Sequence, residues 1–160
     1  MESITADFHI YENSHFGIKI QYPSDWRVNE KEYHRSHSDN QTQIVGFSSR
    51  RSDDAYPKLE NVVLYVKSLL SQNMTIDIYA KKQIHGIQST IKESTPTTIA
   101  GAPAYKVLYR GMKEDMILEV LEAWIMKHDK LYTIACVSAP NDFSSYISIF
   151  QKMIDSFDII

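Results

Sequence analysis

The alternation of apolar and polar residues along the chain predicts mainly β-strands. Alternation with a period of two residues is typical of a strand with one buried face. Residues 8–22 and 116–138 each hold two such segments around a short polar turn, which predicts two antiparallel hairpins. Single strands are expected over residues 43–48, 91–98 and 104–109, with a tight turn at 99–103 and Arg110-Gly111 closing the last of them.

The stretch from Phe16 to Trp26 is the most informative of these segments. Gly17 opens a strand whose apolar positions alternate with Lys and Gln, and Pro23 ends it because proline cannot donate to a sheet. Ser24 and Asp25 are typical turn residues. Trp26 is expected to fold back over the end of the sheet as a core side chain.

Three segments give weaker signals. Residues 29–42 and 50–58 are polar without apolar periodicity, which predicts exposed connections. Residues 61–70 are rich in Val and Tyr, which favours a strand, and a short helix starting from Pro57 is the alternative.

Two amphipathic helices are expected. Thr75 is a typical N-cap, and Asp77 suits the first turn of a helix that ends near Gln88. A second helix starts at Pro140. Its apolar face is expected to consist of Phe143, Ile147, Phe150, Ile154 and Phe157.

This order of elements predicts an α+β fold, with an antiparallel β-sheet flanked by helices in an α/β/α sandwich. A chain of 160 residues is expected to form one domain over residues 1–160, with residues 1–7 as a polar N-terminal tail.

Composition narrows the function. A net charge of −3 without clustered basic residues argues against a nucleic-acid partner, and no apolar run is long enough to span a membrane. The compartment stays open, and is extracytoplasmic if a signal or anchor was removed from the chain as given. Cys136 is the one cysteine and lies in an apolar run, which predicts an inert buried thiol.

The metal-site candidate is the segment His34-Arg35-Ser36-His37-Ser38-Asp39. The imidazoles of His34 and His37 and the carboxylate of Asp39 are ligand types that zinc or copper accepts. A solvated polar loop is the alternative, because no second ligand motif accompanies the segment.

Glu119 and Glu122 do not form a catalytic pair, because an odd spacing places them on opposite faces of a strand. Glu122 shares a face with Trp124. If that face is buried, Glu122 needs a partner such as Lys or Arg from a neighbouring strand, and structural pairing is favoured over the alternative of catalysis. The sequence also lacks a nucleophile elbow and a glycine-rich phosphate loop. It therefore predicts no enzyme and no cofactor.

The chain resembles PsbP-like proteins of the Mog/PsbP-like superfamily, and looks most similar to uncharacterised archaeal members. The resemblance rests on Phe16–Trp26, on Ile99-Ala100-Gly101-Ala102-Pro103-Ala104-Tyr105, on the hairpin with Trp124 and Tyr132, and on the helix ending at Ser156-Phe157. It implies an antiparallel sheet between helices. It also implies protein partners, since plant PsbP is a subunit of the water-oxidising complex and yeast Mog proteins bind the Ran GTPase.

We therefore expect a non-catalytic module for protein binding or assembly, with a protein partner that the sequence does not identify. The alternative is a domain that binds a small ligand or a metal. That domain would use the loop with His34, His37 and Asp39, or a cleft between sheet and helix.

Overall fold

The computed structural model describes residues 7–30, 41–69, 73–87 and 90–160, and these form the following elements. The strands are β1 (Phe8–Asn13), β2 (Ile18–Pro23), β3 (Arg27–Asn29), β4 (Thr42–Ser48), β5 (Val62–Ser68), β6 (Thr90–Ile99), β7 (Ala102–Lys113), β8 (Met116–Lys127), β9 (Lys130–Ser138) and β10 (Asp158–Ile159). The helices are α1 (Ile76–Gly86) and α2 (Phe143–Ser156), and a 3₁₀ turn, η1 (Pro140–Asp142), leads into α2.

The strands of the described ranges form two antiparallel sheets. The small sheet has the order β1-β2-β10, and the large sheet has the order β3-β4-β5-β9-β8-β7-β6. The expected α+β class and both expected hairpins are confirmed. The small sheet as a separate unit is an addition to the expected architecture.

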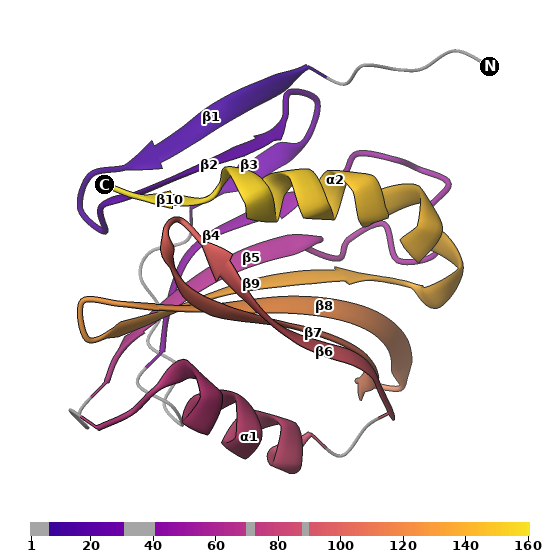
Figure 1. Ribbon diagram of the computed structural model, residues 1–160. Helices are drawn as coiled ribbons and strands as arrows, with labels where there is room; N and C mark the ends of the chain where they lie inside the picture. The colour runs from indigo at the N-terminus through magenta and orange to yellow at the C-terminus, as the bar shows by residue number, and fades with distance from the viewer. Residues whose placement is uncertain (1–6, 31–40, 70–72, 88–89) are drawn as a thin grey trace.

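The elements lie in layers, as Figure 1 shows. Helix α2 lies between the small sheet and one face of the large sheet, where it contacts β2, β8 and β9. Helix α1 lies on the opposite face, against β7 and β8. In the described ranges, no helix has the length and apolar character needed to cross a membrane.

Strand β8 divides its side chains between these two layers. Leu121, Ala123 and Ile125 belong to the core under α2, whereas Trp124 belongs to the cluster under α1. The pleat of a strand sends successive side chains to opposite faces. Every other residue of β8 therefore faces the α1 side.

The segment around Trp26 folds as expected. Trp26 is 6% exposed, and its ring meets Tyr146 of α2 edge to face with 5.8 Å between ring centroids. The short strand β10 pairs with Lys19 and Ile18 of β2, a contact that the sequence did not indicate. Its two residues carry too little periodicity to reveal a strand.

Several boundaries differ from the expected ones. Strand β7 does not close at Arg110-Gly111 but continues to Lys113, because β8 is long enough to pair with it throughout. Residues 61–70 form a strand, β5, as favoured, and the helix alternative is wrong. Within the expected loop 29–42, Asn29 ends β3 and Thr42 begins β4, while residues 31–40 lie outside the described ranges.

Helix α1 follows its expected capping, since the Thr75 hydroxyl accepts a hydrogen bond from the backbone N–H of Ile78 at 3.3 Å. The apolar face of α2 is wider than the expected stripe, whose five residues all lie in or against the core. Tyr146 and Met153 are fully buried beside Phe150, whereas Phe143 and Ile147 are only half-buried. The reason is that α2 packs against the small sheet as well as the large one, which widens its buried face.

The packing of α2 predicts a large stability cost for Phe150→Ala. Phe150 is fully buried, and its ring stacks on Tyr146 with centroids 5.5 Å apart. We expect the free energy of unfolding in urea to fall by about 3–5 kcal/mol, because a buried cavity replaces the ring. The control Ile10→Ala, at a side chain 65% exposed, should change it by less than about 0.5 kcal/mol. Equal effects of the two substitutions would contradict the packing.

Candidate functional site

An open pocket lies on the α1 face of the large sheet, beyond the part that α1 covers. Its volume is about 420 Å³, and its lining comes from β5, β7, β8, β9 and Gln41. The walls are mostly apolar or aromatic and include Tyr65, Tyr109, Leu118, Val120 and Val137. Helix α1 packs on Val107, Trp124 and Leu131. The parts of β7, β8 and β9 that lie farther along the sheet from α1 therefore stay open to a ligand.

Glu122 is the acidic residue of this pocket. One of its carboxylate oxygens accepts a hydrogen bond from the Tyr109 hydroxyl, and the other accepts one from the Trp124 indole N–H at 3.2 Å. The expected Lys or Arg partner is therefore wrong within the described residues: the donors are aromatic and neutral. Among the described residues, the Glu122 carboxylate therefore has hydrogen-bond donors but no ion-pair partner.

The Glu122 carboxylate contributes to raised pKa values of two neighbouring tyrosines. Burial raises the pKa of the Tyr109 hydroxyl, and the neighbouring Glu122 carboxylate raises it further. The pKa of Tyr65 is raised by burial as well, with Glu60 and Glu122 as additional causes. Both phenols are therefore hydrogen-bond donors at neutral pH, and neither can neutralise Glu122.

Thr133 lies beside Glu122 at the border between two pockets. A smaller pocket of about 130 Å³ is lined by Tyr79 and Gln83 of α1 and shares Glu122 and Thr133 with the large pocket. Thr133 is 4% exposed, and within the described part of the chain its hydroxyl oxygen has no hydrogen-bond partner. A buried hydroxyl without a hydrogen-bond partner lowers the stability of the fold, so its presence at this position needs an explanation.

Glu119 has the opposite environment, on the α2 face of β8. It accepts hydrogen bonds from Lys92 Nζ at 2.5 Å and from Arg110 Nε at 3.1 Å. Burial alone would raise the pKa of Glu119, but these two cations outweigh burial and hold the pKa below its usual value. The prediction that Glu119 and Glu122 do not share a site is confirmed.

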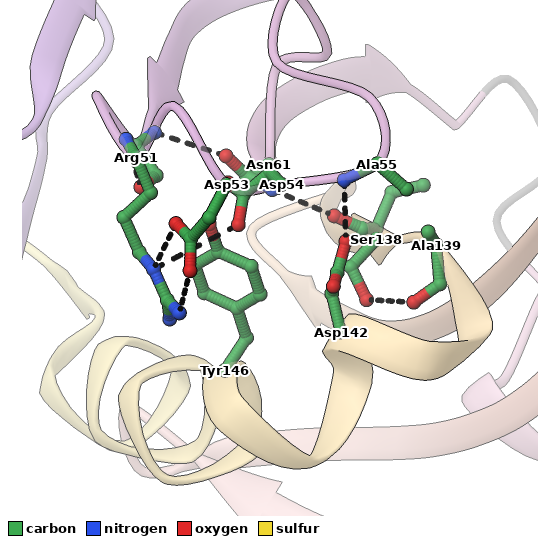
Figure 2. A network of polar contacts seen from close by, with 11 residues as sticks. Arg51, Asp53, Asp54, Ala55, Asn61, Ser138, Ala139, Asp142 and Tyr146 are labelled. Atoms are coloured by element: carbon green, nitrogen blue, oxygen red, sulfur yellow. Dashed lines mark hydrogen bonds and ion pairs between the residues drawn. The ribbon is translucent and has the colours of Figure 1, made fainter.

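A second polar network joins the connection between β4 and β5 to α2 (Figure 2). Arg51 donates to Asp53 at 3.1 Å and lies 3.8 Å from a carboxylate oxygen of Asp54. The hydroxyl of Tyr146 donates to Asp54, and the backbone N–H of Ala55 donates to Asp142 at 3.0 Å. The Arg51–Asp53 pair is exposed, as expected, but the Asp54 side chain is only 8% exposed.

This network has a structural role. Asn61 adds two further links, because it accepts from the backbone N–H of Ser49 and donates to the carbonyl of Val137. The hollow between these residues leaves no room for even a water-sized ligand. We therefore take the network as the attachment of the 49–61 connection, and the Glu122 pocket as the candidate site.

Two other predictions from the sequence concern a metal site and a buried thiol. His34, His37 and Asp39 lie outside the described residues, so the metal site stays a prediction. Across the described ranges, no cluster of three or more His, Cys, Asp or Glu side chains would hold a metal ion. Cys136 is fully buried, which confirms the expected buried thiol, and burial raises the pKa of this thiol.

Sequence reasoning found Glu122 and Trp124 on one face but missed Tyr109 and Thr133. The register of the sheet brings them together: Tyr109 pairs with Val120, and Thr133 pairs with Trp124. Glu122 and Thr133 are polar residues on otherwise apolar faces of two paired strands. This pattern in the sequence could have indicated the site.

Structures of the same fold come from several organisms. Cyanobacterial PsbP (CyanoP) from Synechocystis sp. PCC 6803 is 16% identical with a TM-score of 0.70, and the match covers 100% of this chain and 97% of that one. LpqN, involved in cell envelope biogenesis of Mycobacterium tuberculosis, is 9% identical with a TM-score of 0.61, over 98% and 86% of the chains. The Saccharomyces cerevisiae Ran-binding protein Mog1p is 13% identical with a TM-score of 0.53, over 97% and 96%.

At such identities these likenesses show the fold alone. The expected similarity to archaeal members finds no support in these relatives, which come from bacteria and a yeast. Among curated proteins, none matches the chain. The family described as PsbP-like protein matches residues 2–159.

The unsatisfied hydroxyl predicts that Thr133→Val stabilises the protein. Valine keeps the shape of threonine and removes the buried oxygen that lacks a partner. We expect the free energy of unfolding in urea to rise by about 1 kcal/mol. The control Thr133→Ser retains a hydroxyl and should not stabilise the protein. A loss of stability in the valine variant would show that the hydroxyl has a partner in the folded state.

Proposed function

The chain belongs to the PsbP-like protein family, and from this premise we propose that it is a non-catalytic module that binds another protein. The observation that carries the proposal is the open, mostly apolar pocket on the α1 face. Pockets of about 300–1,000 Å³ with apolar walls and a few polar groups are the usual form of binding sites. The Ran-binding protein Mog1p, which shares this fold, supports a protein partner.

The tip of the hairpin of β7 and β8 extends the binding surface beyond the pocket. Met112 lines the pocket and is 70% exposed, and its cross-strand neighbour Ile117 is 47% exposed. Large apolar side chains that meet at the tip of a hairpin, next to a pocket, are typical of an interaction surface. By the pleat of β7 and β8, Met112 and Ile117 point to the face opposite Leu118 and Glu122. A protein partner that wraps around the hairpin tip would cover this apolar pair as well as the pocket, whereas a small molecule would fill the pocket alone.

The chemistry of the acidic and thiol groups also favours binding over catalysis. The charge of Glu119 is compensated by Lys92 and Arg110, and the Cys136 thiol is sealed in the core. Glu122 lies on the other face of β8 from Glu119, so the two carboxylates cannot work as an acid and a base on one substrate. Glu122 thus remains as a recognition group.

Small-ligand binding in the same pocket is the second candidate. Its support is the enclosed polar end formed by Glu122 and Thr133, which would orient a small molecule. The exposed apolar pair of Met112 and Ile117 at the hairpin tip is the observation that ranks a protein partner above a small ligand.

The proposal predicts that Met112→Glu weakens partner binding. A photo-crosslinking amino acid at position 117, in cells of the source organism, identifies the partner, which is then purified. In calorimetry with that partner, Met112→Glu should lower the affinity on the order of tenfold or more, because it puts a charge into an apolar contact. Its melting temperature should stay close to that of the wild type, since the side chain is exposed.

The matched control is Ile10→Glu, an equally exposed apolar residue on β1 of the small sheet. This variant should bind the partner as the wild type does. Equal affinities of the Met112 and Ile10 variants, or a crosslinked partner that does not bind the purified protein, would remove the tip of the β7–β8 hairpin as part of the docking surface and contradict the ranking of a protein partner above a small ligand.

A further inference from the structure

We propose that the pocket receives the ammonium group of a lysine side chain on the partner protein, with Glu122 as its counter-ion and Thr133 as a second acceptor. The inference rests on the proposed function and names the chemistry that the partner must present. Its observations are the contacts of Glu122, the unsatisfied hydroxyl of Thr133, and the walls of the pocket.

The Glu122 carboxylate has free hydrogen-bond acceptor capacity. A carboxylate offers about four lone-pair positions, and the Tyr109 hydroxyl and the Trp124 indole each take one. None of the Lys and Arg residues in the described ranges forms an ion pair with Glu122 within 4.0 Å. The carboxylate therefore presents both remaining acceptor capacity and an uncompensated negative charge to the pocket.

Thr133 offers a second hydrogen-bond acceptor. Its hydroxyl oxygen is buried, unpartnered within the described residues, and shares both pockets with Glu122. An ammonium group has three donors and no acceptor. One ammonium group can therefore donate hydrogen bonds to the Glu122 carboxylate and to the Thr133 oxygen at the same time. A carboxylate or carbonyl ligand only accepts hydrogen bonds, so it cannot serve both groups.

The walls of the pocket suit a lysine side chain. Leu118, Val120 and Val137 give the pocket an apolar lining beside Glu122. A lysine side chain suits such a lining, because its four-carbon stem is apolar and only its tip is charged. The rings of Tyr65 and Tyr109 also line the pocket, and aromatic faces attract ammonium groups.

The positive charges nearby do not occupy this position. Lys67 lines the smaller pocket, where its Nζ lies 5.0 Å from the centre of the Tyr79 ring. Lys113 lies at the rim of the large pocket and is exposed. Both weaken the attraction for a second cation, so the recognition depends on direct contact with Glu122 and should be short-ranged.

The test uses a lysine side chain without the rest of the partner. The probe is Nα-acetyl-L-lysine methylamide, and the matched probe is Nα-acetyl-L-norleucine methylamide, which has a similar stem without the ammonium. The readout is the indole N–H signal of Trp124 in NMR spectra of the ¹⁵N-labelled full chain, since that group donates to Glu122. The chain has two tryptophans, and Trp26→Phe assigns the signals.

We expect the lysine probe to shift the Trp124 signal saturably and the norleucine probe to leave it in place. Glu122→Gln should weaken the lysine probe roughly tenfold or more, because it removes a charged acceptor. The control Glu93→Gln removes an exposed carboxylate on β6 and should leave the affinity unchanged. If Glu122→Gln does not fold, Thr133→Val should weaken the probe by roughly threefold or more.

Two results would overturn the inference: an equal response to both probes, or no saturable shift with the lysine probe. The outcomes also separate the inference from the proposed function. A silent lysine probe, together with partner binding that Met112→Glu abolishes, would remove the ammonium and keep the protein-binding module. A bound lysine probe without any protein partner would instead assign the pocket to a free amine and contradict the proposed function.

Discussion

The period of two residues along β8 is the constraint on which the rest of the structure depends. It sends Leu121, Ala123 and Ile125 into the core under α2 and directs Glu122 and Trp124 to the opposite face. The same alternation gives Glu119 two cationic partners and leaves Glu122 with neutral ones. Because a slip of one residue would exchange the two faces, the register of this strand determines both the core and the candidate site.

Most of the fold could be predicted from the sequence, because its strands and helices are long and strongly periodic. The hairpin of β8 and β9, the strand before Pro23 and the capped helix after Thr75 follow from local patterns alone. Strands β3 and β10 have only two or three residues and form because a partner strand is present. The buried face of α2 is wider than the predicted stripe and includes Tyr146 and Met153, because it also packs on the small sheet, a long-range contact that no local pattern encodes.

The candidate site could be predicted only in part. The sequence places Glu122 beside Trp124 but indicates a basic partner, because a buried carboxylate usually has one. The contact with Tyr109 and the nearness of Thr133 depend on the registers of β7 and β9 against β8. An open pocket with an uncompensated carboxylate breaks the rules that hold in the core, and such exceptions are expected at binding sites.

The position of a bound lysine side chain tests the central claim most directly. Intermolecular nuclear Overhauser effects can be measured between the ε-methylene protons of Nα-acetyl-L-lysine methylamide and the aromatic protons of the protein. The account predicts contacts with the rings of Tyr109 and Trp124, on either side of the Glu122 carboxylate. Contacts confined to another surface, such as Tyr22 on the small sheet, would contradict it.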